Sequence, residues 1–129
     1  MSIELPADRQ PAIRVVAMPK DTNSCDSIFG GWILSQIDIA AAIPALERAK
    51  GRVATVAVNS VEFHEPVFVG DVVSCYAEVI KTGKTSITVK VEVYAERNFS
   101  NKEVVKVTEA ELTFVALDEN RKPRLVPEE

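Results

Sequence analysis

One segment of this sequence, residues 29–49, predicts a helix that is apolar on nearly every side. Its apolar residues follow the three- and four-residue spacing of one helical face but fill most of the other faces too: Ile33, Leu34, Ile37, Ile39, Ala40, Ala41, Ala42 and Ile43. A helix that is apolar all round is expected to be buried all round. The segment contains one carboxylate, Asp38. Because an isolated buried charge is costly unless something pairs with it or uses it, Asp38 is the first candidate for a functional residue.

From residue 53 onward the apolar period changes from 3.6 residues to two, which is typical of strands. The pattern predicts strands over residues 53–63, 72–81, 86–96 and 104–117, with a shorter strand over 12–18. In the strand over 86–96, one apolar row should face the helix: Ile87, Val89, Val91 and Val93. The alternation slips between residues 104 and 107, which indicates a β-bulge.

The ends and the middle of the helix carry their own signals. Asp26 or Ser27 is expected to cap its start, and Lys50 with Gly51 to end it. Pro44 predicts a kink near residues 40–44, because a proline ring clashes with the carbonyl four residues earlier.

This order of elements predicts an α+β fold of the hotdog type, in which a curved antiparallel sheet of about five strands wraps one long central helix. We expect a single domain over residues 1–129, with residues 1–11 and 118–129 as flexible arms. One sheet cannot cover a helix that is apolar on all sides, so a partner should cover what remains.

Composition narrows the classes of function. The net charge of −4 argues against a general nucleic-acid binder. No apolar run approaches the ~20 residues of a membrane span, and the first residues lack a signal-peptide pattern, so we expect a cytoplasmic protein without membrane contact. Cys25 and Cys75 are expected to be free thiols. The single histidine, His64, makes a histidine-built zinc site improbable, and no flavin, metal or nucleotide-loop motif is present, so no cofactor is expected.

Several runs then resemble a known family: residues 18–23 (MPKDTN), 28–38 (IFGGWILSQID), 50–53 (KGRV), 55–58 (TVAV), 69–73 (VGDVV) and 114–116 (FVA). They resemble the acyl-CoA thioesterase branch of the hotdog family, and most of all the short bacterial YciA-like acyl-CoA hydrolases. The resemblance covers nearly all of the chain between the two arms. The sequence departs from the pattern at residues 24–27, where relatives often carry a glycine, and at Pro44.

The resemblance implies hydrolysis of acyl-CoA thioesters at a site between two protomers. Asp38 falls at the catalytic acid position, Asn23 matches the loop asparagine, and Gly30 and Gly31 match the glycines that open the helix. Relatives also suggest a trimer of dimers. Coenzyme A is then part of the substrate and product, not a cofactor.

The residue chemistry agrees with this implication. Backbone N–H groups at a helix start, near Gly30 and Gly31, are free donors that can polarise a thioester carbonyl. Asp38 can act as general base or as nucleophile, and the sequence does not separate the two. Asp38 lies roughly 10 Å along the helix from Gly31, so one carbonyl cannot easily meet both in a single chain. An antiparallel pair of helices across a two-fold axis removes this difficulty.

Other residues are candidates for supporting roles. Thr55 can orient a water molecule or Asp38, with core packing as the alternative. Positive charge for the phosphates of coenzyme A can come from Arg52, Lys81 and Lys84, while Thr85 and Ser86 can contact its pantetheine arm. The alternative is a solvated, charged turn.

The main residues have structural alternatives as well. Asp38 can be a core acid satisfied by Ser35, by Gln36 or by a neighbouring strand, Asn23 can simply hold a turn, and the two glycines can allow tight packing.

Two other functions stay open. A non-catalytic acyl-CoA binding module predicts binding without turnover. A lyase that hydrates an enoyl-CoA would require His64 in the cleft.

Overall fold

The computed structural model describes residues 3–129, so the first two residues of the expected N-terminal arm lie outside it. The helix and strands are β1 (Ile13–Val16), α1 (Gly30–Ala49), β2 (Val53–Phe63), β3 (Val72–Thr82), β4 (Ser86–Arg97) and β5 (Glu103–Ala116). Two single turns of 3-10 helix, η1 (Pro19–Asp21) and η2 (Phe99–Asn101), lie between them. Every predicted strand is present. The first is shorter than predicted, and the bounds of β2 match the prediction.

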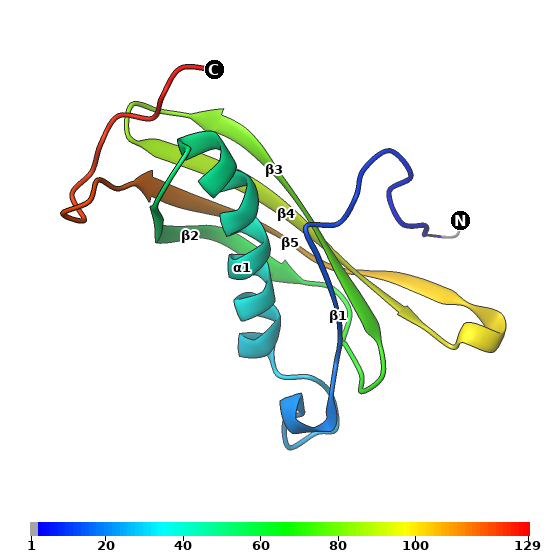
Figure 1. Cartoon of the computed structure of the whole chain (residues 1–129). Coiled ribbons are helices and arrows are strands. Elements are labelled where there is room, and N and C mark those ends of the chain that lie inside the picture. Colours follow the sequence, from blue (N-terminus) through cyan, green and yellow to red (C-terminus); the bar gives the residue numbers. More distant parts are fainter. Residues whose placement is uncertain (1–2) are drawn as a thin grey trace.

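All strand pairs are antiparallel, and the sheet has the order β1-β3-β4-β5-β2. The helix α1 lies across one face of the sheet, between the short edge strand β1 and the other edge strand β2 (Figure 1). This is the predicted arrangement of one long helix against a five-stranded sheet. The outer edge of β2 pairs with no other strand of residues 3–129.

The core lies between α1 and the facing side of the sheet. The predicted row on β4 is fully buried there: Ile87, Val89, Val91 and Val93. Small residues on the facing side of the helix, among them Ala40, Ala41 and Ala45, are also fully buried. Since alanine has a short side chain, α1 can approach the sheet closely. The predicted register of β4 is therefore confirmed.

The β-bulge predicted between residues 104 and 107 is confirmed. Val93 of β4 pairs with Thr108, whereas the next residue, Tyr94, pairs with Lys106, so Val107 is the extra residue of β5. A bulge of this kind increases the local twist of the strands.

The second face of β4 differs from the prediction. Glu96 should point into solvent, yet its side chain is fully buried. It accepts a hydrogen bond from Arg14 at 2.8 Å and lies 2.6 Å from the ammonium group of Lys102. A buried carboxylate needs such partners, because its desolvation would otherwise be costly. Alternation along one strand cannot reveal them, since Arg14 comes from β1.

A second ion pair covers the same face nearby. Burial alone would raise the pKa of Glu92, but hydrogen bonds from Arg9 and Lys106 outweigh it and lower that pKa to about 2. The Arg9 guanidinium lies 2.9 Å from the Glu92 carboxylate. Residues of the N-terminal segment thus contact the face of the sheet that lies opposite α1.

One expectation about the helix changes. Phe29, not Asp26 or Ser27, precedes the first helical residue, and no side chain caps it. Phe29 can take this position because its N–H donates to the Asp21 carbonyl at 3.1 Å. The expected end of the helix is confirmed, since Lys50 follows the last helical residue in the left-handed conformation, with φ of 53°. The helix continues through Pro44 as one element, and the kink near residues 40–44 stays a prediction.

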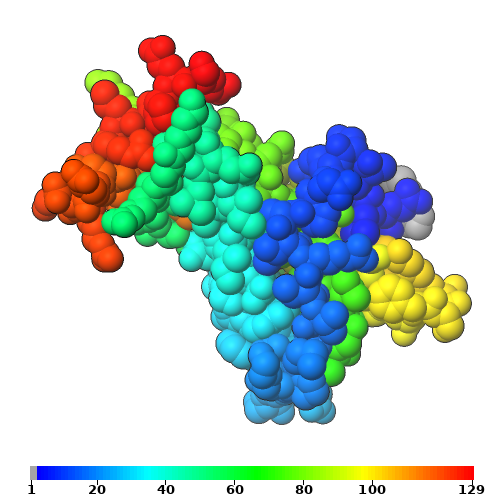
Figure 2. All heavy atoms as spheres, viewed as in Figure 1, coloured from blue at the N-terminus to red at the C-terminus, as the bar shows by residue number. Residues whose placement is uncertain are grey.

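The helix is also not buried all round in the single chain. Ile39 is 53% exposed, and Ile43 and Leu46 are exposed as well. Figure 2 shows α1 at the surface of the molecule along much of its length. The sheet therefore covers one side of an apolar helix and leaves the other side bare, where a partner was expected.

The C-terminal residues fasten the end of α1 to the sheet. Arg124 donates to the Ala49 carbonyl through Nη2 at 2.8 Å and to the Leu117 carbonyl through Nε at 2.8 Å. The Val126 N–H donates to the Lys84 carbonyl at 2.8 Å. Within residues 3–129, no helix has the length and apolar character that crossing a membrane requires.

The packing of β5 can be tested with two leucine truncations. Leu112 is 1% exposed and pairs with Val58 and Val89, whereas Leu125 is 70% exposed. Leu112→Ala should lower the free energy of unfolding by about 2–5 kcal/mol, because it removes buried methyl groups and leaves a cavity. Leu125→Ala, the matched control, should change it by about 0.5 kcal/mol or less. Urea denaturation at one protein concentration measures both, and equal losses would contradict the core described above.

Candidate functional site

Asp38 and Thr55 form the central pair of the site. The Thr55 hydroxyl on β2 donates to Asp38 Oδ1 on α1 at 2.7 Å. The two candidate partners on the helix do not satisfy Asp38, since Ser35 donates to the Trp32 carbonyl and Gln36 contacts Ser35. The prediction of a buried acid is wrong for the single chain, because Asp38 is exposed. The neighbouring strand β2 supplies the partner, Thr55, which agrees both with the supporting role expected for Thr55 and with the structural alternative for Asp38.

The elements that hold this pair expose an unusual amount of apolar surface. On β2, Val56 is 56% exposed and Val58 is 51% exposed, and α1 leaves Ile39, Ile43 and Leu46 bare. An exposed apolar surface beside an unpaired strand edge is typical of a protein–protein interface. A partner on this surface would take Asp38 out of bulk water.

The start of α1 supplies backbone donors. Neither the Gly30 N–H nor the Gly31 N–H has an acceptor within residues 3–129, whereas those of Phe29 and Trp32 do. Both glycines are exposed. A side chain at position 31 would lie 3.2 Å from the Phe29 ring, so glycine relieves crowding there. Free N–H groups at the positive end of a helix dipole favour a negatively charged oxygen.

Asn23 lies in the loop before the helix and holds a turn. Its Oδ1 accepts hydrogen bonds from the N–H of Cys25 at 2.7 Å and of Ser27 at 3.3 Å, and its Nδ2 donates to Ser27 Oγ at 3.2 Å. In the single chain Asn23 therefore does what its structural alternative predicted. Its side-chain amide carries a second N–H, and the residue is exposed, so this N–H can donate to a bound molecule.

Two of the three predicted basic residues, Arg52 and Lys84, come together at one end of the sheet. The Arg52 carbonyl accepts from Leu117 N–H, and the Thr85 carbonyl accepts from Ala116 N–H, each at 2.9 Å. Lys84 lies at the same end of the sheet, where its carbonyl accepts a hydrogen bond from the Val126 N–H of the C-terminal segment. A cavity of about 460 Å³ opens here, with a charged lining: Lys50, Gly51, Arg52, Leu117, Asp118, Glu119 and Arg124.

Sequence reasoning missed two members of this cluster, Lys50 and Arg124. Their place in the cluster depends on the C-terminal segment, which packs against the end of α1. Because that segment was expected to be a flexible arm, the sequence did not predict this contact. Ser86 opens β4 at the same turn, where its carbonyl accepts from Gly83 N–H at 2.8 Å. Lys81 lies on β3 and pairs with Thr88.

A smaller cavity of about 330 Å³ lies beside the start of α1. Its lining is mainly apolar: Ile28, Gly30, Ile33, Phe63, His64, Glu65, Pro66 and Val67. Sequence reasoning placed His64 at a strand end on the surface, and it is half-exposed, with Nε2 3.9 Å from Glu62. His64 also lines a cavity next to Gly30. This cavity forms where the segment after β2 meets the start of α1, a contact that the sequence did not predict.

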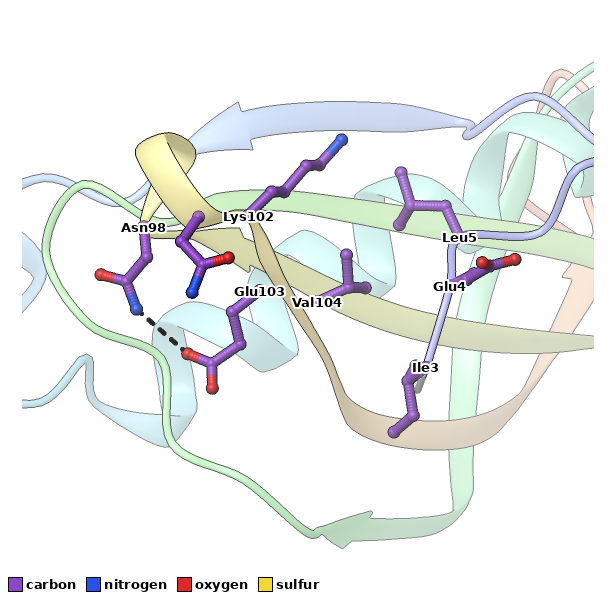
Figure 3. Close-up of a pocket in the computed structure, with 8 residues that line it drawn as sticks. Ile3, Glu4, Leu5, Asn98, Lys102, Glu103 and Val104 are labelled. Atoms are coloured by element: carbon purple, nitrogen blue, oxygen red, sulfur yellow. Dashed lines mark hydrogen bonds between the residues drawn. The ribbon is translucent and has the colours of Figure 1, made fainter. Parts of the chain in front are cut away.

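A larger hollow lies away from all these residues. It has a volume of about 800 Å³ and lies between residues 3–5 and the connection from β4 to β5 (Figure 3). The Asn98 amide donates to Glu103 within it at 3.2 Å. It contains none of the residues predicted to form the site.

The single chain thus brings together some predicted residues and separates others. Asp38 meets Thr55, and Arg52 lies near Lys84 and Thr85. The donors at Gly31 and the Asp38 carboxylate stay apart, because seven residues of helix span roughly 10 Å.

Comparison with known proteins places the chain in a family. Residues 26–98 match the model of the thioesterase superfamily. The chain belongs to this superfamily. It is 49% identical over 117 residues to the acyl-CoA thioester hydrolase YciA of Salmonella typhimurium, covering 89% of this chain and 88% of that protein.

Solved structures agree with the family assignment. A hexameric thioesterase from Yersinia pestis superposes with a TM-score of 0.88 at 49% identity, covering 97% of this chain and 100% of that one. A hexameric hotdog-fold thioesterase of Campylobacter jejuni superposes with a TM-score of 0.90 at 44% identity, covering 95% of this chain and 93% of that one. The predicted α+β hotdog fold of the thioesterase superfamily is therefore confirmed.

The two thiols should differ in reactivity. Cys25 is exposed in the loop before α1, whereas burial raises the pKa of the Cys75 thiol to about 12. Because the thiolate is the reactive form, a disulfide reagent near pH 8 should titrate one thiol per chain in the native protein and two after denaturation. Cys25→Ser should abolish the native signal. Rapid reaction of both thiols without denaturant would contradict the placement of Cys75 in the core.

Proposed function

We propose that this protein is an acyl-CoA thioesterase, which hydrolyses an acyl-CoA to a free carboxylic acid and coenzyme A. The observation that carries the proposal is Asp38, held by Thr55 at 2.7 Å on a bare apolar face. A carboxylate in such a place can accept a proton. In the single chain, no second protein surface encloses it. The names of the relatives, acyl-CoA thioester hydrolases, supply the substrate class.

The proposed catalytic unit is a dimer with two equal sites. Two α1 helices lie antiparallel across a two-fold axis, so the Gly31 end of one helix faces the partner's Asp38. The arrangement covers the exposed Ile39 and Val56 and brings the donors and the carboxylate, separated in one chain, to one carbonyl group. Three such dimers would form a hexamer like those of the relatives from Yersinia pestis and Campylobacter jejuni.

The proposed chemistry uses both ends of this arrangement. The free N–H groups near Gly30 and Gly31 donate to the thioester oxygen and stabilise its negative charge as the carbonyl carbon is attacked. Asp38 either accepts a proton from the attacking water or attacks directly to form an anhydride that water then cleaves. A carbon–oxygen bond forms, the carbon–sulfur bond breaks, and the thiolate of coenzyme A takes up a proton.

Thr55 and Asn23 have positioning roles in this scheme. The Thr55 hydrogen bond occupies Oδ1 of Asp38 and leaves Oδ2 to face water or the thioester carbon. The remaining amide N–H of Asn23 can hold the water or the thioester.

The coenzyme A moiety is proposed to bind at the charged end of the sheet. Arg52 and Lys84 would meet its phosphates, while Thr85 and Ser86 would contact the pantetheine arm. The cluster lies near the end of α1, and Lys50 there is about 18 Å along the helix from Asp38. An extended pantetheine arm can join two such points.

One observation favours a second function. His64 lines the cavity beside Gly30, and a histidine near helix-start donors is what hydration of an enoyl-CoA would require. Its side chain faces Glu62, however, and the carboxylate that the thioesterase uses lies on another part of the helix. An enoyl-CoA included in the assays below distinguishes the two, since hydration removes its conjugated absorbance without releasing a thiol.

The chemistry is tested by Asp38→Asn. This change keeps the shape but removes the base and nucleophile, so turnover should fall by at least ~10²-fold. Glu47→Gln, an exposed acid on the same helix, is the matched control and should leave turnover near the parent value. Thiol release from a short and a long acyl-CoA gives the rates, with circular dichroism to establish folding.

Binding distinguishes the remaining alternative. Coenzyme A should bind Asp38→Asn about as well as the parent, because its phosphates lie far from the carboxylate. Folded Asp38→Asn protein with parental turnover would refute the assignment of Asp38. Parent protein that binds acyl-CoA but releases no thiol would instead indicate a binding module.

A further inference from the structure

We infer that the 330 Å³ cavity beside the start of α1 holds the acyl chain of the thioester, and that Glu65 at its rim restricts it to uncharged acyl groups. This inference rests on the proposed function, because it assumes that the thioester carbonyl lies at the Gly30–Gly31 donors. It adds the chemical class of the acyl group and the residues that select it.

The walls of the cavity have the polarity that an acyl chain needs. Ile28, Ile33 and Val67 are at most 5% exposed and belong to the hydrophobic core, so the cavity reaches inward from the surface. The ring of Phe63 forms another wall and lies 3.7 Å from the position of a side chain at Gly30. An acyl chain whose carbonyl lies at Gly30 would therefore contact apolar surface from its first carbons. This contact favours the transfer of the acyl chain out of water.

The two ends of an acyl-CoA need opposite environments, and two cavities at opposite ends of α1 differ in that way. The cavity near the end of α1 is lined by Lys50, Arg52 and Arg124 together with two acidic residues, and it suits phosphates. The cavity at the start of α1 has no lysine or arginine in its lining. The charged end of the substrate would lose its solvation in the apolar cavity, so the acyl chain is the part that fits there.

The rim of the apolar cavity carries negative charge. Glu65 lines it, and Glu62 lies 3.9 Å from the His64 ring. Arg97 donates to the carbonyl of the lining residue Pro66, but it is paired with Asp71 at 2.8 Å. A carboxylate at the far end of an acyl chain would find no unpaired cation in this lining and would face Glu65. Acyl groups with a terminal carboxylate should therefore be poor substrates.

The size of the cavity can be changed at Phe63. Phe63 is 48% exposed, so replacing it should not disturb the core. In Phe63→Trp the larger ring should lower kcat/KM for octanoyl-CoA by about 10-fold or more relative to acetyl-CoA, in line with what pocket contacts can discriminate. Phe63→Ala should shift the preference toward the longer chain. Phe99→Trp, at the exposed η2 turn, is the matched control and should leave the ratio unchanged.

The charge at the rim is tested separately at Glu65. The parent should hydrolyse butyryl-CoA at least about 10-fold more efficiently than succinyl-CoA, and Glu65→Lys should raise the succinyl-to-butyryl ratio of kcat/KM by a similar factor. Glu65→Gln should give a smaller rise, and Glu103→Lys, exposed and in the hollow that contains none of the predicted site residues, should give none.

The outcomes separate this inference from the function on which it rests. Parent protein that hydrolyses none of these thioesters contradicts the proposed function. Parent protein that hydrolyses them, with chain-length and charge ratios unchanged in folded Phe63 and Glu65 variants, overturns the inference and leaves the proposed function standing. If Phe63→Trp does not fold, Phe63→Ala and Glu65→Lys still decide it.

Discussion

Packing of α1 against a single sheet leaves half of an apolar helix in contact with solvent. On the covered side, small alanines let the helix approach the row from Ile87 to Val93. On the other side, Ile39 and Ile43 stay exposed next to Asp38, and β2 offers an unpaired edge. A second copy of the chain would cover both. The charge at position 38 is therefore tolerable in the single chain, where water reaches it, and the proposed partner would enclose it as a catalytic group.

The polar groups assigned to the proposed thioester hydrolysis are distributed along α1. Its first turn has free N–H groups at Gly30 and Gly31, its middle has the Asp38 carboxylate held by Thr55, and its last residues border a basic cavity. In one chain these three parts cannot act on one carbonyl. In the proposed dimer, an antiparallel pair of helices brings the N–H groups of one chain to the Asp38 carboxylate of the other, while the charged cavity stays at the surface for the phosphates of coenzyme A. The geometry of the helix thus motivates both the proposed dimer and the proposed site.

Much of the fold could be predicted from the sequence, because local periodicity controls it. The bounds of β2, the buried row on β4 and the extra residue at Val107 follow from where apolar residues alternate and where they slip. The features that failed depend on contacts between distant segments. Glu96 is buried because Arg14 reaches it from another strand, and Phe29 can begin the helix because Asp21 supplies its backbone acceptor.

The candidate site divides in the same way. Asp38, Asn23 and the two glycines were found from a motif, and Thr55 from its strand next to the helix. Lys50, Arg124 and His64 were missed as lining residues, because their cavities form where a terminal segment or a loop meets the end of α1. The exposure of Asp38 was also missed, since an apolar helix does not show whether its own sheet or a partner covers each side.

The central claim, that each site takes its donors from one chain and its carboxylate from another, is tested most directly by mixing two variants. Asp38→Asn lacks the carboxylate, and Gly31→Pro lacks a helix-start N–H in the first turn, where proline is best tolerated. Each alone should be nearly inactive. Co-expressed with different affinity tags, they should recover about a quarter of parental turnover, since random pairing makes half of the dimers hybrid and each hybrid holds one intact site. Purified hybrids with no more activity than either variant alone would contradict the account.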